Sequence, residues 1–296
     1  MQNIKILLDS TCDMSDELMK RFDLDYVRMG VTIDDVTYPA SLTWESFTST
    51  EYYEIIKKKR VYTNQITEPE FLELFNKLVD EGNDVLYIAC SSGLSGSVKE
   101  AAKAAAKVME EKPGSKIIAI DSLISGMGQG ILGIHASDLR AEGKSIDEIA
   151  QIIEGEKLTM NQWGTVNDLN YLKRAGRVTA TSAFFGNLFA VKPILISDAK
   201  GHNVAAKKVN TRKKSLDEIA QSLIRTIKEG GEGRYIAITH ADCPEDAAYV
   251  KKIIDDAGVN YKECFICPLG PILSASCGPQ TVVTYNFGPE VTYVGE

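Results

Sequence analysis

The first half of the chain alternates short apolar runs with segments of helical period. The apolar runs have the length of buried strands and cover residues 4–8, 85–89 and 116–120. A segment with a helical pattern follows each of them, at residues 15–22, about 97–111 and 126–141. Repeated strand–helix units of this kind predict a parallel sheet with helices on both faces, which is a Rossmann-like α/β domain.

Between the first two of these units the pattern is less regular. It predicts a strand, a helix and a polar loop, at residues 26–34, about 44–59 and 60–70. Within the loop, Thr67 and Glu70 have the spacing of a capping box for a further helix. That cap leaves the polar run at 63–65 unexplained.

The hydrophobic pattern changes near residue 158, and we place a domain boundary there. The second half mixes strands and helices without a regular repeat, which predicts an α+β domain at 159–296 after a Rossmann-like domain at 1–158. The expected strands of this half are residues 160–166, 194–197, 204–209, 235–239, 261–266, 282–285 and 291–294. We expect a loop of small residues at 269–281. The apolar stretch 179–190 predicts either a core helix or the wall of a hydrophobic tunnel.

Composition adds bounds on the class of protein. A chain of 296 residues, 44% of them hydrophobic, has enough apolar material for two domains and an internal pocket. The formal net charge of −8 argues against nucleic acid as a partner, because Lys and Arg must neutralise its phosphates. No apolar run reaches the roughly 20 residues of a membrane span. The N-terminal segment lacks the basic region and cleavage site of a secretion signal, so we expect a cytoplasmic protein.

Metal-binding patterns are weak. The six cysteines are scattered, which is typical of reduced thiols rather than of a disulfide framework. Cys264 and Cys267 form a lone C-x-x-C pattern with apolar residues between them, as in a buried strand. The three histidines are far apart in the sequence. We therefore expect no metal site and no cofactor.

Polar residues follow all three apolar runs of the first half. They are Asp9, Ser10, the segment 90–92, Asp121 and Ser122. The carboxyl ends of parallel strands share one edge of a sheet, where α/β proteins bind ligands. The turn S-S-G-L-S-G-S at 91–97 also opens a helix, whose free N–H groups favour an anion such as a phosphate, a carboxylate or an oxyanion.

The turn does not match the common phosphate-binding loops, since it contains neither G-x-x-x-x-G-K-[ST] nor G-x-G-x-x-G. One alternative is a serine hydrolase acting on an acyl ester, with Ser95, His240 and Asp242 as a triad. Its G-x-S-x-G motif is incomplete, because Ser97 stands where the second glycine belongs. The other alternative is a non-catalytic binder of an organic acid, with hydroxyls around the carboxylate and the apolar second half around the tail.

Several motifs carry a family resemblance over nearly the whole chain. They are D-S-T at 9–11, T-N-Q at 63–65, S-S-G-L-S-G-S at 91–97, D-S at 121–122, D-L…L-K-R-A-G-R-V at 168–178 and G-P-I at 270–272. Together they resemble the DegV family of bacterial fatty-acid-binding proteins, which includes the binding subunit of fatty acid kinase.

The resemblance implies a two-domain fold with an acyl chain, such as that of palmitate, buried between the domains. It implies that Thr63 and Ser95 hold the carboxylate of the fatty acid. It also implies additional ligand contacts from Ser92, Gly93 and Ser276.

Arg177 matches a family arginine that meets a kinase partner or an acyl phosphate. Two loops depart from the family pattern: in the last loop Ser276 replaces a histidine and Gln280 a glycine, and in the first loop Asn64 and Ile66 replace Ser and Pro. A serine donates a hydrogen bond to a carboxylate but does not carry a proton as histidine does. We therefore predict a protein that binds a long-chain fatty acid without catalytic activity of its own, with presentation of the acid to a fatty acid kinase as a further expectation.

Overall fold

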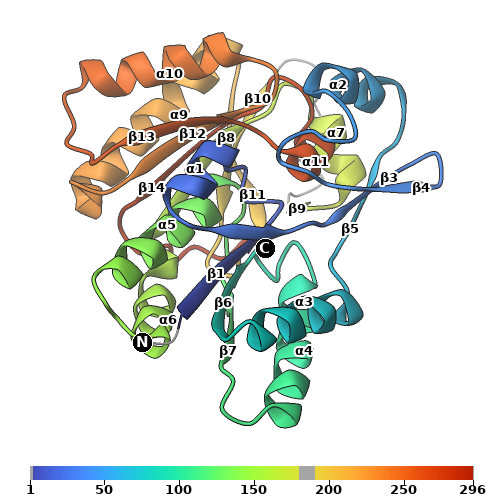
Figure 1. Cartoon of the computed structure of the whole chain (residues 1–296). Helices are drawn as coiled ribbons and strands as arrows, with labels where there is room; N and C mark the ends of the chain where they lie inside the picture. The colour runs from blue at the N-terminus through green and yellow to red at the C-terminus, as the bar shows by residue number, and fades with distance from the viewer. Residues whose placement is uncertain (1–2, 180–190, 296) are drawn as a thin grey trace.

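The computed structural model describes residues 3–179 and 191–295, whose strands form three sheets (Figure 1). The first is a parallel four-stranded sheet in the order β2-β1-β6-β7. Its strands are β1 (Asn3–Asp9), β2 (Asp25–Val27), β6 (Asn83–Ala89) and β7 (Ile117–Asp121). The helices of this half are α1 (Asp16–Arg21), α2 (Ser49–Lys58), α3 (Glu68–Asp80), α4 (Ser97–Glu111), α5 (Met127–Ala141) and α6 (Ile146–Glu156).

The central strands of this sheet are apolar on both sides, so helices cover both faces. Leu7 and Tyr87 lie in one hydrophobic core together with side chains of α3 and α4. Leu8 and Ile88 point the other way, into a core that they share with α5 and α6. Successive strand residues face opposite sides of a sheet, which explains the continuous apolar runs. The predicted Rossmann-like arrangement of the first half is confirmed.

A second, small antiparallel sheet has the order β4-β3-β5. Its strands are β3 (Gly30–Ile33), β4 (Val36–Pro39) and β5 (Tyr62–Asn64). The single strand predicted at 26–34 is wrong, because the chain leaves the parallel sheet where the Met29 N–H donates to the Ser10 hydroxyl at 3.0 Å. The polar loop predicted at 60–70 is wrong in part, because β5 pairs with β3 there and places Thr63 opposite Val31.

Local capping sets the ends of two helices in this region. The helix predicted at about 44–59 begins later than expected, because Thr48 and Glu51 form a capping box at its start. The capping box predicted for Thr67 and Glu70 is confirmed, with the Glu70 carboxylate accepting the Thr67 N–H at 2.7 Å.

The second half forms a seven-stranded sheet in the order β13-β12-β14-β8-β10-β11-β9. Its strands are β8 (Met160–Thr165), β9 (Val178–Thr179), β10 (Lys192–Ser197), β11 (Asn203–Val209), β12 (Ile236–His240), β13 (Cys264–Pro268) and β14 (Val282–Phe287). The helical elements are η1 (Lys157–Thr159), α7 (Leu169–Ala175), α9 (Arg212–Thr226), η2 (Ile227–Gly231), α10 (Pro244–Asp256) and α11 (Pro271–Cys277). This mixed sheet confirms the α+β character predicted for the second half.

The two halves share a hydrophobic core. Ile236 and Ile238 of β12 pack with α9 and α10 on one face of the large sheet. On the other face, Ala237 and Tyr285 lie in the same core as Ile131 of α5 and Leu8 of β1. Helix α5 therefore lies between the two sheets. The strands of each sheet come from one half of the chain only, and a boundary at 158/159 stays a prediction.

Three expectations for the second half have different outcomes. The loop predicted at 269–281 is wrong in part, because it contains α11, which begins with Pro271 at its first position. The strand predicted at 291–294 is also wrong: Val291 N–H bonds Leu158 O of η1 and Tyr293 O accepts Ala199 N–H of the β10–β11 hairpin turn, so these bonds join the segment to a short helix and a turn instead of a strand. The apolar stretch at 179–190 was predicted as a core helix or tunnel wall. Its residues 180–190 lie outside the part of the chain that the structure describes.

Candidate functional site

The carboxyl ends of β1, β6 and β7 meet at one edge of the parallel sheet, where the sequence predicts a ligand site. Asp9, at the end of β1, is fully buried and accepts hydrogen bonds on both oxygens. Its donors include the Thr11 hydroxyl (2.6 Å), the Tyr87 hydroxyl (2.9 Å) and the Cys90 N–H (2.8 Å). Asp9 therefore fixes the loops of the edge to each other, and is neither a helix cap nor free for a ligand.

The serine turn at 91–97 is held from two sides. On one side, the Ser91 hydroxyl donates to Gly201 O at 2.8 Å, in the β10–β11 hairpin of the second half. On the other side, the Gln65 side-chain oxygen accepts the Gly96 N–H at 3.1 Å, and the Ser97 hydroxyl accepts the Ile66 N–H at 3.2 Å. Gln65 thereby caps α4 at Gly96, which has no side chain, and the Ser95 hydroxyl accepts the Ser97 N–H at 3.3 Å.

Gly96 is required for this approach of the two segments. A Cβ atom at this position would lie 2.3 Å from the Gln65 side-chain oxygen. Because β5 ends just before Gln65, the same contact brings Thr63 of β5 toward Ser95 of the turn. The Ser95 hydroxyl is 3.0 Å from the Ser97 hydroxyl.

A cavity of about 390 Å³ opens beside the turn and is lined by every residue that the family resemblance assigned to the site, whereas Asp9, Ser10, Asp121 and Ser122 at the strand ends do not line it. Its lining combines hydroxyls, apolar side chains and one cation. The predicted members are Thr63, Ser92, Gly93, Ser95, Arg177 and Ser276. The other lining residues are Thr11, Met29, Gln65, Cys90, Leu94, Gly96, Leu172, Asn203, Ile272, Leu273 and Cys277. The structure thus places the predicted residues together, and their contact with a ligand stays a prediction.

A second cavity, of about 120 Å³, shares Thr63, Arg177 and Ser276 with the first and is strongly basic. Lys59, Arg60 and Arg174 also line it, without an acidic residue. Arg60 lies 4.7 Å from the centre of the Tyr62 ring, and Arg174 lies 4.5 Å from that of Tyr171. We call this the basic cavity.

The arginines of the basic cavity lack acidic partners. Arg177 donates to Ala175 O at 2.8 Å and to Leu94 O at 3.4 Å. Within residues 3–179 and 191–295, no carboxylate forms an ion pair with Arg60, Arg174 or Arg177. Three guanidinium groups without counter-charges in a chain of net charge −8 make this cavity a place for an anion.

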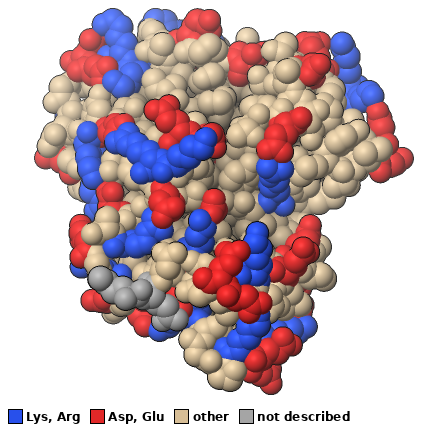
Figure 2. All heavy atoms as spheres, viewed as in Figure 1, with Lys and Arg blue, Asp and Glu red and all other residues tan. Residues whose placement is uncertain are grey.

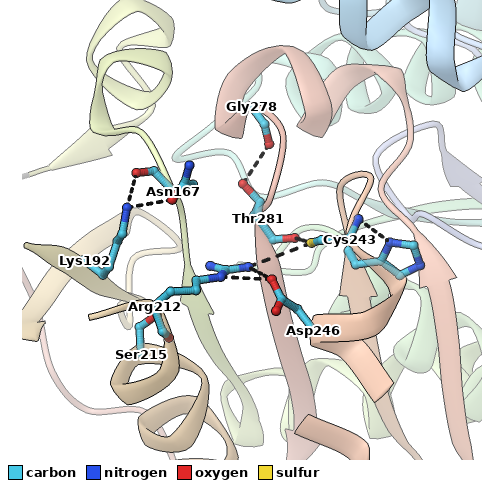
Figure 3. Close-up of polar contacts among 9 residues, drawn as sticks. Asn167, Lys192, Arg212, Ser215, Cys243, Asp246, Gly278 and Thr281 are labelled. Atoms are coloured by element: carbon cyan, nitrogen blue, oxygen red, sulfur yellow. Dashed lines mark hydrogen bonds and ion pairs between the residues drawn. The ribbon is translucent and has the colours of Figure 1, made fainter. Parts of the chain in front are cut away.

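The basic run at 207–214, by contrast, is mostly ion-paired. Arg212 contacts Asp246 of α10 at 2.7 Å, as Figure 3 shows. Lys207 pairs with Glu218, and Lys213 pairs with Asp217. On the face of the described residues in Figure 2, basic and acidic side chains are likewise interspersed, with no continuous basic stripe.

Ser276, which replaces the family histidine, lies on α11. Its hydroxyl donates to Ile272 O, one turn earlier, at 3.3 Å. The helix itself is held by the Tyr52 hydroxyl, which donates to Pro271 O at 2.9 Å, and by Tyr53, which is 3.1 Å from the Ser274 hydroxyl.

Because the Ser276 hydroxyl is already bonded to its own helix, its removal has a small expected effect. At the fatty-acid site that the family resemblance predicts, Ser276→Ala should weaken the affinity for palmitate by less than about fivefold, which corresponds to about 1 kcal/mol or one neutral hydrogen bond. Titration of delipidated protein with a fluorescent fatty acid, displaced by palmitate, measures this. A loss as large as that of a Ser95 variant would contradict it.

The contacts required by the serine-hydrolase alternative are missing among the described residues. The Ser95 hydroxyl bonds Ser97, and His240 Nδ1 accepts the Cys243 N–H at 3.4 Å. Figure 3 shows Cys243 in contact with Arg212 and with the backbone oxygen of Thr281. Burial lowers the pKa of His240, so the imidazole is neutral there. Among the residues that the structure describes, Ser95 therefore has no general base at hydrogen-bond distance.

The described ranges contain neither a metal-binding cluster nor a membrane-spanning helix. No group of three or more His, Cys, Asp or Glu side chains is placed to hold a metal ion. No helix has both the length and the apolar character needed to cross a membrane.

Sequence comparisons identify the family. The family model described as "Uncharacterised protein, DegV family" matches residues 3–285. A DegV domain-containing protein of Clostridium perfringens is 31% identical over 290 residues, which cover 97% of this chain and 98% of that protein. The chain belongs to the DegV family, as its motifs predicted.

Solved structures of DegV family proteins share the fold of this protein over nearly the whole chain. A DegV family protein of Thermus thermophilus, described by its fatty acid binding, has a TM-score of 0.86 at 26% identity and covers 98% of this chain and 100% of its own. Bacillus subtilis DegV, described as a fatty acid binding protein, has a TM-score of 0.81 at 28% identity, with coverages of 97% and 100%. The predicted α/β fold class is confirmed.

Proposed function

We propose that this protein binds a long-chain fatty acid such as palmitate in the 390 Å³ cavity, with the carboxylate at Thr63 and Ser95. The observation that carries the proposal is the lining of that cavity. Hydroxyls of two separate segments lie on the same cavity as Met29, Leu172 and other apolar side chains. The fatty acid binding described for the Thermus and Bacillus relatives supports it.

The energetics of such a site are coherent. Burial of each methylene contributes roughly 0.8 kcal/mol, so a palmitate chain gains on the order of 10 kcal/mol. Burial of the carboxylate costs several kcal/mol unless it is hydrogen-bonded, and the hydroxyls together with the Arg177 guanidinium offset this. Ser92, Gly93 and Ser276 are the additional contacts in this proposal. Neither a metal nor a cofactor has a part in it.

Native mass spectrometry of the purified protein, followed by lipid extraction, tests this function. The expected result is a protein mass increased by one fatty acid, which the extraction identifies. A purified protein without fatty acid that also takes up no added palmitate would refute the proposal. Labelling of Ser95 by a fluorophosphonate would instead favour the serine-hydrolase alternative, because only an activated serine reacts.

We propose further that the protein presents the bound acid to a fatty acid kinase, and has no catalytic activity of its own. The basic cavity supports this, since it adjoins the proposed carboxylate position through Thr63, Arg177 and Ser276. A phosphoryl group reaching the carboxylate through this cavity would meet the unpaired arginines. Such a role accords with the cytoplasmic location predicted from the sequence.

Charge reversal in the basic cavity separates binding from presentation. Arg60→Glu with Arg174→Glu changes residues that line only the basic cavity. We expect palmitate affinity to stay within about threefold, and the rate of acyl phosphate formation with a bacterial fatty acid kinase and ATP to fall by at least about tenfold. Lys77→Glu with Lys228→Glu is the matched control at exposed positions away from both cavities. A wild-type rate in the arginine variant would refute presentation through this cavity.

A further inference from the structure

Asp13 is a buried carboxyl group with an unusual set of neighbours. Its side chain lies just beyond β1, and the residue is 2% exposed. One carboxyl oxygen accepts the Gly270 N–H at 2.7 Å. The other is buried without a hydrogen-bond partner among the described residues. No cation of residues 3–179 or 191–295 forms an ion pair with it.

The Gly270 contact is important for the site because Gly270 directly precedes α11. That helix supplies Ile272, Leu273 and Ser276 to the proposed fatty-acid cavity. A Cβ atom at Gly270 would lie 3.2 Å from the bonded oxygen of Asp13, so the two segments are in close contact. Asp13 thus attaches the start of α11 to the loop after β1, although 257 residues separate the two in the sequence.

The titratable groups that face Asp13 come from several elements, and none of them carries a positive charge. They are Asp9, Cys12, Tyr53, Cys267, Cys277 and Tyr285. Burial raises the pKa of Asp13 well above its usual range, and Asp9 raises it further, while the bond from Gly270 lowers it in part. The surroundings therefore favour the neutral carboxylic acid.

The unbonded oxygen has a hydroxyl group in its vicinity. A Cβ atom built on Gly126 would lie 2.1 Å from the Tyr285 hydroxyl and 3.2 Å from this oxygen of Asp13, so both border the same glycine. Gly126 has φ of 64°, which favours glycine, and the absence of a side chain there leaves room for the Tyr285 hydroxyl and the Asp13 oxygen. Asp9 differs from Asp13, because donors reach both of its oxygens.

We propose that Asp13 is a positioning residue of the fatty-acid site: as a neutral acid, it holds the start of α11 and thereby the wall of the cavity that Ser276 lines. This inference rests on the proposed function for its effect on binding. The protonation of Asp13 itself is independent of any ligand.

Asp13→Asn and Asp13→Ala test the two parts. Asparagine keeps the acceptor oxygen and resembles the neutral acid, so palmitate affinity near about pH 7 should stay within about threefold. Alanine removes the acceptor of Gly270 N–H, and affinity should fall by at least about tenfold. Equal affinity of the alanine variant and the wild type, or an equal loss in both variants, would overturn the positioning role.

A stability profile of delipidated protein between about pH 5 and pH 9 tests the protonation. A carboxyl whose pKa is raised in the folded state stabilises the fold at low pH, and this stabilisation is lost as the pH rises toward the folded-state pKa. Asparagine does not titrate, so Asp13→Asn should gain on the wild type as the pH rises, by up to about tenfold in the unfolding equilibrium constant per pH unit.

Asp9→Asn is the control in the same experiment, and should be less stable than the wild type throughout, because its new amide N–H₂ would face donors. A difference between Asp13→Asn and the wild type that is flat, or that shrinks as the pH rises, would overturn the neutral acid. Should Asp13→Ala not fold, the two asparagine variants still decide this part. Failure of wild-type protein to bind palmitate would refute the proposed function and leave the stability profile interpretable.

Discussion

Replacing Thr63 and Ser95 together with alanine is expected to weaken palmitate binding by about 10²–10⁴-fold. Each hydroxyl donates to a carboxylate in the proposed complex, and a hydrogen bond to a charged group contributes about 1.5–3 kcal/mol. The sum of about 3–6 kcal/mol corresponds to the stated change in Kd. Because the acyl chain keeps its apolar contacts, weak binding should persist. Displacement of a fluorescent fatty acid by palmitate measures the affinity of the double variant and of the wild type.

The matched control removes two hydroxyls outside the cavity. Thr32 and Thr37 bond each other at 2.8 Å on the exposed side of the small sheet and do not line the cavity. Thr32→Ala with Thr37→Ala should leave palmitate affinity unchanged within about twofold. Unchanged affinity of the Thr63 and Ser95 double variant would show that the carboxylate binds elsewhere.

Gly201→Ala is expected to have the second largest effect, on both stability and binding. Gly201 has φ of 74°, and an added Cβ would lie 2.0 Å from the Ser91 hydroxyl and 2.9 Å from Leu123 Cα. The strained backbone costs about 1–2 kcal/mol, and the overlap about 1–3 kcal/mol more. Since Ser91 begins the turn that carries Ser95, the affinity for palmitate should fall by at least about tenfold.

Gly258→Ala separates the cost of the strained backbone from the cost of the overlap with Ser91. Gly258 has a similar φ of 62°, but a Cβ atom there would have no neighbour within 4 Å. Urea unfolding should therefore show only the backbone cost of about 1–2 kcal/mol, with palmitate affinity unchanged. Equal losses in the two variants would mean that the contact between the β10–β11 hairpin and the serine turn is unimportant.

The parallel sheet was predictable because its information is local. Leu7 and Leu8 are adjacent apolar residues that face opposite sides of their strand, and a segment with a helical hydrophobic period follows each strand. Strand β5 was not predictable in this way. It has three residues, two of them polar, and it forms by pairing with β3, a distant segment of the sequence in which Val31 lies opposite Thr63.

The same reasoning explains how the site residues were found. The strand–turn–helix pattern located the serine turn at 91–97, whereas the choice of Ser95 and Thr63 as carboxylate contacts came from the family resemblance. Gln65 was missed as the cap of α4, because the contact joins two segments that are 31 residues apart.

Helix α11 was missed for a related reason. Its small residues have no clear helical period, and contacts from Tyr52, Tyr53 and Asp13 hold it in place. Only the Gly-Pro pair at its start is a local signal for a helix. Sequence patterns thus locate the strand ends, but tertiary contacts decide which loop residues meet there.

A crystal structure of the protein with palmitate tests the central claim most directly. The proposal predicts electron density for an acyl chain in the 390 Å³ cavity, with carboxylate oxygens at hydrogen-bond distance, about 2.5–3.2 Å, from the hydroxyls of Thr63 and Ser95. Density that places the carboxylate at the end of the cavity away from Thr63 and Ser95, or an empty cavity at saturating palmitate, would contradict the proposal.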